Sequence, residues 1–212
     1  MPIPRPTAER LAQLYRILTR RDTREPTVTS SELENLTGWP SHTIRKDIST
    51  LSAGHDISTT NGYDTGRLAS AIETALGLAG NSYPCALVGL GRLGSAFLDY
   101  PGFEGTAYRI AAGFDSNVNR IEILRASFPL YPAFKMKEVI PRLGIGHAIL
   151  CVSEQTAQEA AARIIDSGVR AIVNFTPAIL SVPGGIEVEN VSILDALGTL
   201  TARLAVQKGE AT

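Results

Sequence analysis

Apolar residues in the first 80 positions recur with the period of an α-helix. In the first segment they stand at i, i+3, i+4 and i+7, as Leu11, Leu14, Tyr15 and Leu18. This spacing predicts an amphipathic helix from Thr7 to about Arg21, opening after Pro6. The polar loop Asp22 to Thr29 then breaks the pattern. The chain therefore begins with a helix that buries one of its faces.

Two short helices joined by a tight turn are expected after that loop. Ser31 and Glu34 have the spacing of a capping box, and Gly38 follows the first of these helices. Pro40 and Ser41 precede the second, where the serine can cap the helix. A further apolar stripe predicts a connecting helix from Asp64 to about Ala79.

The second of the two short helices has one apolar and one polar face. Its apolar residues are Ile44, Ile48 and Leu51. This is the pattern of a helix-turn-helix, whose second helix enters the major groove of DNA. The candidate DNA-contacting residues are Ser41, His42, Thr43, Arg45, Lys46 and Ser49. A small helical bundle with solvated Arg45 and Lys46 would show the same pattern, so both interpretations stay open on this segment alone.

Beyond about residue 80, short Val, Ile and Ala runs alternate with helical patterns, which marks a domain boundary. The apolar runs are Cys85–Val88, Ile110–Asp115, His147–Val152 and Ala171–Phe175. A helical stretch from Glu154 to Ser167 lies between the last two, and another runs from Ser192 to about Val206. The alternation predicts an α/β fold with a doubly wound parallel sheet.

The first apolar run leads directly into Gly89-Leu90-Gly91-Arg92-Leu93-Gly94, a G-x-G-x-x-G motif between a strand and a helix. Gly89 permits the tight turn, Gly91 lets pyrophosphate approach the backbone, and Gly94 lets helix and strand pack closely. The helix N-terminus is expected to face the phosphates. The motif therefore predicts a dinucleotide site.

Asp115 ends the second apolar run, 21 residues after Gly94. A carboxylate there accepts the adenosine-ribose hydroxyls, and it repels a 2′-phosphate, so NAD or NADH is favoured. Arg92 in the loop leaves the phosphorylated forms open. The alternative, that Asp115 only caps a turn, is disfavoured by the motif. Because ligands bind at the carboxyl ends of parallel strands, Val152 and Phe175 join the candidate site.

Composition narrows the class of protein. The 212 residues carry a net charge of −1, so any DNA contact must be local. No run approaches the ~20 apolar residues of a membrane span, and the N-terminus lacks a secretory signal, which favours the cytoplasm. No histidine is placed as a dehydrogenase acid/base, and no catalytic triad or metal spacing appears, so no enzyme is expected. Cys85 and Cys151 lie in apolar runs and are expected to be buried thiols.

Taken together, these halves resemble the Rex family of redox-sensing transcriptional repressors. The likeness spans nearly the whole chain and rests on Ile3-Pro4, Thr7–Leu11, Tyr15-Arg16, Thr43–Asp47, Val88–Gly94, Asp99–Phe103, Gly113–Asp115, Ala157-Gln158 and Asn174–Pro177. The last segment, Asn-Phe-Thr-Pro, is the most specific. The resemblance implies a winged-helix domain at 1–80, an NAD(H)-binding Rossmann domain at 81–190 and a C-terminal helix at 191–212 that is exchanged within a homodimer.

The resemblance also implies a mechanism and a set of switch residues. Family members bind a palindromic operator in double-stranded DNA when NADH is scarce, and NADH releases them. Arg16 and Tyr100 match a switch pair that contacts an aspartate at the start of the C-terminal helix. Here Ser192 stands at that position, and Asp195 is the nearest acid.

Two further departures affect the predicted sites. Ser153 replaces the proline of a Thr-Val-Pro segment beside the nicotinamide, where the ring's oxidation state is discriminated. The wing from Ser52 to Tyr63 lacks the family's basic pair and keeps only Gly62-Tyr63, which predicts weaker phosphate binding. The main hypothesis is an NADH-sensing repressor. The alternatives are an NAD(H)-binding Rex paralogue with lost or altered operator recognition, acting at another DNA site or on a protein partner, and an NAD-dependent oxidoreductase.

Overall fold

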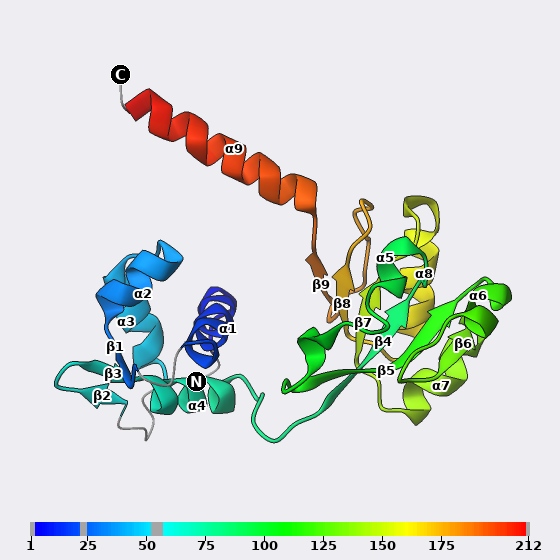
Figure 1. Cartoon of the computed structure of the whole chain (residues 1–212), viewed down its shortest axis with the longest axis horizontal. Coiled ribbons are helices and arrows are strands. Elements are labelled where there is room, and N and C mark those ends of the chain that lie inside the picture. The colour runs from blue at the N-terminus through cyan, green and yellow to red at the C-terminus, as the bar shows by residue number, and fades with distance from the viewer. Residues whose placement is uncertain (1–2, 22–24, 52–56, 211–212) are drawn as a thin grey trace. The chain divides into compact units, whose positions relative to one another are not determined.

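The computed structural model describes residues 3–21, 25–51 and 57–210. The chain divides into two compact units, Met1–Asn81 and Ser82–Thr212 (Figure 1). Each unit has its own hydrophobic core, helical in the first and built on a parallel sheet in the second.

The first unit is a winged helix, with four helices and a small antiparallel sheet among its described residues. The helices are α1 (Arg5–Thr19), α2 (Ser30–Thr37), α3 (Ser41–Ser49) and α4 (Thr65–Ala75). The strands are β1 (Thr27–Val28), β2 (Ser58–Thr59) and β3 (Gly62–Asp64), in the order β1-β3-β2. Leu11, Ile44 and Leu68 from three different helices are fully buried, so the predicted apolar faces meet in one core.

Two local predictions in this unit were wrong. The capping box is formed by Thr29 and Glu32, two residues before the predicted pair: the Thr29 hydroxyl accepts the Glu32 N–H at 3.1 Å, and Glu32 accepts the Thr29 N–H at 2.6 Å. Ser41 does not cap α3, because Pro40 occupies the cap position and the Ser41 hydroxyl donates to Glu34 instead. The predicted connecting helix, α4, packs against α1 as part of the core.

The second unit is built on a six-stranded parallel sheet with helices on both faces (Figure 1). The strands are β4 (Tyr83–Val88), β5 (Tyr108–Asp115), β6 (Leu130–Pro132), β7 (His147–Leu150), β8 (Ala171–Asn174) and β9 (Glu187–Asn190). Their order is β6-β5-β4-β7-β8-β9, which confirms the doubly wound prediction. The order reverses at β4, and this reversal opens a crevice at the strands' carboxyl ends.

The helices of this unit differ in length. They are α5 (Arg92–Ser95), α6 (Val118–Ile123), α7 (Met136–Arg142), α8 (Glu154–Asp166) and α9 (Ile193–Glu210), with 3-10 turns at Pro101–Phe103 and Ala133–Lys135. The helix predicted after the glycine motif is only four residues long, so its dipole adds little to an anion site. Among the described helices, none has the length and apolar character of a membrane span.

The two edge strands of the sheet are short or charged, whereas helix α9 exposes apolar side chains. The edge strand β9 carries Glu187 and Glu189, and the other edge strand, β6, has three residues and ends at Pro132. Helix α9 starts after Ser192, whose hydroxyl accepts the Asp195 N–H at 3.1 Å. Its apolar side chains are 52–78% exposed: Ile193, Leu194, Leu197, Leu200 and Leu204. The edge strands are therefore poor templates for pairing with another strand, while α9 displays an apolar surface.

Candidate functional site

The glycine loop after β4 has a shape that side chains would block. Gly89 has φ +90°, and a Cβ there would lie 2.7 Å from the Cys151 carbonyl oxygen. A Cβ on Gly94 would lie 1.8 Å from the Gly89 carbonyl oxygen, whereas a Cβ on Gly91 would have no atom within 4 Å. Gly89 and Gly94 thus fold the loop, and Gly91 leaves open space beside its backbone.

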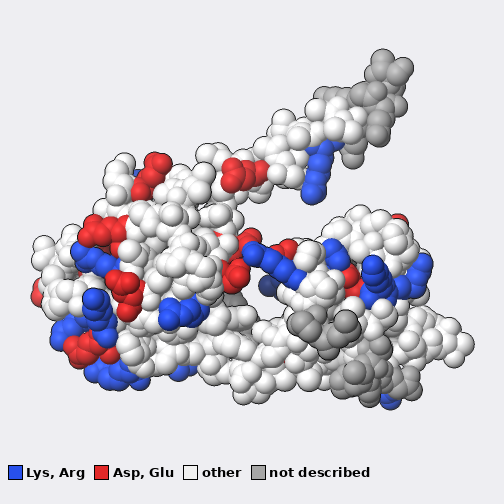
Figure 2. Space-filling view, turned by 180° about the vertical axis from the view of Figure 1, so that it is seen from behind, with Lys and Arg blue, Asp and Glu red and all other residues white. Residues whose placement is uncertain are grey.

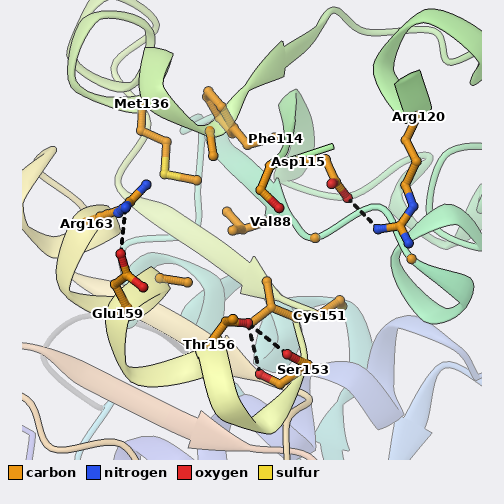
Figure 3. Close-up of a pocket in the computed structure, with 16 residues that line it drawn as sticks. Val88, Phe114, Asp115, Arg120, Met136, Cys151, Ser153, Thr156, Glu159 and Arg163 are labelled. Carbon is orange, nitrogen blue, oxygen red and sulfur yellow. Dashed lines mark hydrogen bonds and ion pairs between the residues drawn. The ribbon is translucent and has the colours of Figure 1, made fainter. Parts of the chain in front are cut away.

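That open space belongs to a cavity of about 480 Å³ at the carboxyl ends of the strands. Figure 3 shows Val88, Phe114 and Asp115 on one side of it, and Cys151, Ser153 and Thr156 on another. Its remaining lining residues are Gly89, Gly91, Ser116, Arg120, Ala133, Met136, Val152, Glu159, Ala160 and Arg163. A cavity of this volume, with an apolar floor and a few polar groups, suits a small molecule or part of a dinucleotide.

Asp115 organises the polar end of this cavity. Its side chain is almost fully buried, yet it accepts hydrogen bonds from the Leu90 N–H at 2.7 Å and the Asn117 N–H at 2.7 Å. Arg120 reaches the same carboxylate at 3.3 Å (Figure 3). The carboxylate therefore holds the glycine loop in place, and a ribose hydroxyl must share it with these donors.

Helix α3 presents a polar face in the first unit. His42, Arg45, Lys46 and Ser49 are exposed, Ser41 and Thr43 are half-buried, and Ile44 and Ile48 are buried. Two links tie α3 to α2: Ser41 to Glu34, and the Arg45 guanidinium to the Ser30 hydroxyl at 3.0 Å. The hydrogen bonds from Ser41 hold the pKa of Glu34 below its usual value. On the face shown in Figure 2, cationic and anionic side chains lie interspersed over both units. A DNA contact would thus rest on a local set of side chains.

An ionic group centred on the buried Asp47, behind α3, was not predicted from the sequence. Asp47 accepts hydrogen bonds from Arg10 Nε at 2.6 Å and Nη2 at 2.8 Å, and from the Thr7 hydroxyl at 2.9 Å. Although burial alone would raise the pKa of Asp47, the bonds from Arg10 and Thr7 hold it below its usual value. The same pairing raises the pKa of Arg10. The group is ionised at neutral pH and joins α3 to α1.

Comparison with known proteins identifies the family. A family model described as "CoA binding domain" matches residues 81–178, and one described as "Putative DNA-binding protein N-terminus" matches residues 2–49. The redox-sensing transcriptional repressor Rex of Limosilactobacillus reuteri is 35% identical over 93% of this chain and 92% of its own. That of Streptomyces coelicolor is 32% identical over 98% of this chain and 80% of its own. The chain belongs to the Rex family.

A solved Rex-family structure supports the same assignment over the whole fold. The repressor RSP has a TM-score of 0.81 at 27% identity, covering 97% of this chain and 95% of its own. RSP has also been solved with beta-NADH, and with beta-NAD+ and operator DNA. The named Rex relatives are regulators rather than enzymes.

Not all residues predicted for the Rex nucleotide site line the cavity. Gly89, Gly91, Asp115, Val152 and Ser153 do line it. The others lie nearby or elsewhere: Leu90 and Gly94 are buried in the loop, Arg92 and Leu93 are exposed outside the cavity lining, and Phe175 packs against Phe97. Arg92 therefore stands outside the described lining, and Arg120 is the cation beside Asp115.

Helix α8 supplies cavity residues that the prediction missed. Thr156, Glu159, Ala160 and Arg163 follow one another at helical spacing along its cavity face, and Arg163 pairs with Glu159 at 2.6 Å (Figure 3). Part of the signal was present, because the helix that follows β7 begins at the carboxyl edge of the sheet, where ligands bind. The i, i+3, i+4 and i+7 spacing of these residues could have identified them.

The strand-end segment where this Rex protein departs from its family has ordinary backbone geometry. Ser153 has φ −70°, which a proline would also adopt, and its hydroxyl lies 3.0 Å from that of Thr156. The neighbouring Cys151 is half-buried rather than buried, and burial raises its pKa to about 12. Cys85 is buried, and burial raises its pKa to about 11. Both cysteines are free, and both are thiols at neutral pH.

The wing is only partly described. Ser52 to Asp56 lie outside the described residues. The described remainder, from Ile57 to Asp64, includes β2 and β3 and contains no Lys or Arg. The weaker phosphate binding expected from this loss stays a prediction.

The four predicted switch residues are divided between the two units. Arg16 is exposed on α1, in the first unit. In the second, Tyr100 is 53% exposed and has edge-to-face contacts with Phe97 and Phe103. Ser192 caps α9, and Asp195 is exposed in its first turn. The serine thus performs the capping role that an aspartate could perform, without its charge. A contact between Arg16 and these residues remains a prediction.

Proposed function

We propose that this chain is a transcriptional repressor that binds operator DNA through α3 and leaves it when NADH occupies the cavity of the second unit. The observation that carries the proposal is the glycine loop, which meets Asp115 at the strand-order reversal and opens, at Gly91, onto a cavity. A reversal of this kind is where dinucleotides bind in doubly wound folds. Family membership adds the response to NADH and the operator.

Different cavity residues are suited to three different parts of the dinucleotide. The open backbone at Gly91 suits the pyrophosphate, and Asp115 suits the adenosine ribose. Val152 and Ser153, between β7 and α8, would then lie beside the nicotinamide. When bound, the dinucleotide would serve as a signal whose redox state the protein reads. The chain's own residues bind and orient it.

The DNA-binding residues proposed are those on the polar face of α3. His42, Arg45, Lys46 and Ser49 are exposed there, where a recognition helix makes base and phosphate contacts. Ser41 and Thr43 lie at the start of α3, and recognition helices contact base edges with their N-terminal residues. A homodimer would present two such helices and would select a palindromic site.

Helix α9 supports the proposed dimer. Its five apolar side chains from Ile193 to Leu204 are more than half exposed, and an exposed apolar stripe of this kind marks an interaction surface. A second copy of α9, or an exchanged position within the dimer, would cover it. The expected test is the mass in solution: the whole chain should be dimeric, and a chain ending at Val191 should be monomeric.

The decisive experiment is DNA binding by fluorescence anisotropy at fixed moderate salt, without nucleotide, with NAD and with NADH. We expect specific binding to a palindromic Rex operator that NADH abolishes and NAD does not. If NADH binds by calorimetry while the operator binds no better than random DNA, a nucleotide-binding paralogue replaces the proposal. Steady oxidation of NADH by a small carbonyl substrate would instead establish an oxidoreductase.

A further inference from the structure

The side chain of Asp47 points away from the face of α3 proposed to bind DNA. Residues two apart on a helix are separated by about 200°, so Asp47 lies on the side of α3 opposite Arg45. It is 2% exposed, and two nitrogens of Arg10 bind its two carboxylate oxygens at 2.6 and 2.8 Å. Thr7 adds a third bond from the same helix, α1. A forked guanidinium-carboxylate pair fixes both distance and angle.

The other polar links of α3 involve no carboxylate as deeply buried as Asp47. Arg45 to Ser30 is exposed, and Ser41 to Glu34 is partly buried, and both lead to α2. Water competes with such links and salt screens the charged ones, so they set orientation weakly. The Arg10–Asp47 pair is screened less, because the Asp47 side chain is only 3% exposed, although that of Arg10 is 27% exposed. It is therefore the stronger polar constraint among those described for α3.

We propose that Arg10 and Asp47 are positioning residues for DNA recognition: the pair fixes the rotation of α3 against α1, so that Arg45 and its neighbours meet base edges in register. This inference rests on the proposed function. A buried ion pair adds little net stability compared with an apolar pair, but in several proteins it selects one geometry. Here the geometry selected is the orientation of the recognition helix.

The proposal separates two kinds of DNA binding. Hydrogen bonds to base edges require an accurate helix position, whereas phosphate contacts depend mainly on charge. Loosening the pair should therefore reduce specific binding far more than non-specific binding. A purely structural role would reduce stability and both kinds of binding together.

The informative variant is Arg10→Lys. Lysine keeps a cation beside Asp47, so no buried charge is left alone, but a single ammonium cannot reproduce the fork. Asp47→Asn is the second variant and leaves Arg10 without its anion. Glu9→Gln is the matched control, because it removes one negative charge from an exposed, salt-bridged site on the same helix.

The full-length protein would first select a duplex from a randomised library. Its affinity for that duplex and for a scrambled duplex of the same composition would then be measured for every variant, with the thermal unfolding temperature. For Arg10→Lys we expect specific affinity to fall about tenfold, the loss of one well-placed charged hydrogen bond, while non-specific affinity and its salt dependence stay unchanged. Glu9→Gln should match the wild type.

The possible results separate the hypotheses. Equal losses of specific and non-specific affinity in Arg10→Lys, or no loss of either, would overturn the positioning role. If Asp47→Asn does not fold, Arg10→Lys alone decides. If the wild type selects no duplex, the proposed function fails, and this inference fails with it.

Discussion

The two candidate sites of this protein differ in what shapes them: the backbone in one and side chains in the other. The cavity of the second unit is shaped by backbone: Gly89 and Gly94 allow the loop to fold back, and the Leu90 N–H is held by Asp115. The proposed DNA-binding face of the first unit is shaped by side chains, with Arg45 and Lys46 on a helix whose opposite side is held by Asp47. A backbone-shaped site should tolerate almost no added atoms at its glycines. A side-chain site should change gradually as charges are removed.

The sharpest test of this contrast is Gly94→Ala. The added Cβ would lie 1.8 Å from a carbonyl oxygen of the backbone, which cannot move aside cheaply. An overpacking cost of about 3 kcal/mol corresponds to a roughly hundredfold loss of NADH affinity, measured by calorimetry. Gly91→Ala is the matched control for folding, because no atom lies within 4 Å of its Cβ. It should unfold at the wild-type temperature and still bind NADH poorly. Normal NADH binding by Gly94→Ala would contradict the backbone-shaped site.

Asp115→Asn tests the one side chain on which the loop depends. Asparagine keeps the shape but removes the charge that the Leu90 N–H, the Asn117 N–H and Arg120 share. Losing charge-assisted hydrogen bonds costs about 1.5–3 kcal/mol, so NADH affinity should fall about tenfold or more. The preference for NADH over NADPH should also narrow, because the repulsion of a 2′-phosphate is lost. The exposed Glu138→Gln on α7 provides the control, and an unchanged NADH affinity in Asp115→Asn would remove Asp115 from the site.

The side-chain site should respond in smaller steps. Arg45→Ala and Lys46→Ala each remove a cation from the exposed face of α3. Each lost phosphate contact should lower the slope of log affinity against log salt by about one unit, without changing the unfolding temperature. Lys137→Ala, on α7 in the other unit, should leave the slope unchanged. A slope that does not change in either α3 variant would place the DNA contact elsewhere.

The smallest effect is expected at the cysteines. Burial raises the pKa of Cys151 to about 12 and that of Cys85 to about 11. At pH 8 the thiolate fraction of Cys151 would be about one in ten thousand, so alkylation by iodoacetamide should be slow. Raising the pH toward 10 should accelerate it about tenfold per unit, because thiolate forms below the pKa in proportion to hydroxide. Rapid alkylation at pH 7, detected by peptide mass spectrometry, would contradict the raised pKa of these thiols.

Sequence patterns predicted features that leave little choice of residue. Only glycine fits at Gly89 and Gly94, and the order of strand, motif and helix along the chain is enough to identify that loop. Periodicity also predicted the buried face of α3, with Ile44 and Ile48 inside. These features could be read because they depend on neighbours close in the sequence.

Features that depend on distant neighbours could not be read. Arg10 and Asp47 are 37 residues apart, and nothing in either segment indicates that they meet.

Some local features were also ambiguous in the sequence. Two Ser/Thr–Glu pairs, two residues apart, have capping-box spacing, so spacing alone could not select Thr29 and Glu32. The edge strands β6 and β9 are short, and β9 is largely polar, so they lack the apolar run of a buried strand.

The edge strands of the parallel sheet also bear on aggregation. An open edge strand offers unpaired backbone groups to other chains and can seed aggregates. In this protein one edge carries two glutamates, and the other is three residues long and ends in proline, which has no N–H to offer. Once folded, the sheet therefore has edge strands that disfavour strand-to-strand pairing with other chains. In the proposed dimer, contact between copies would instead involve the exposed leucines of α9, where a helix partner, and not an extended strand, would cover the apolar surface.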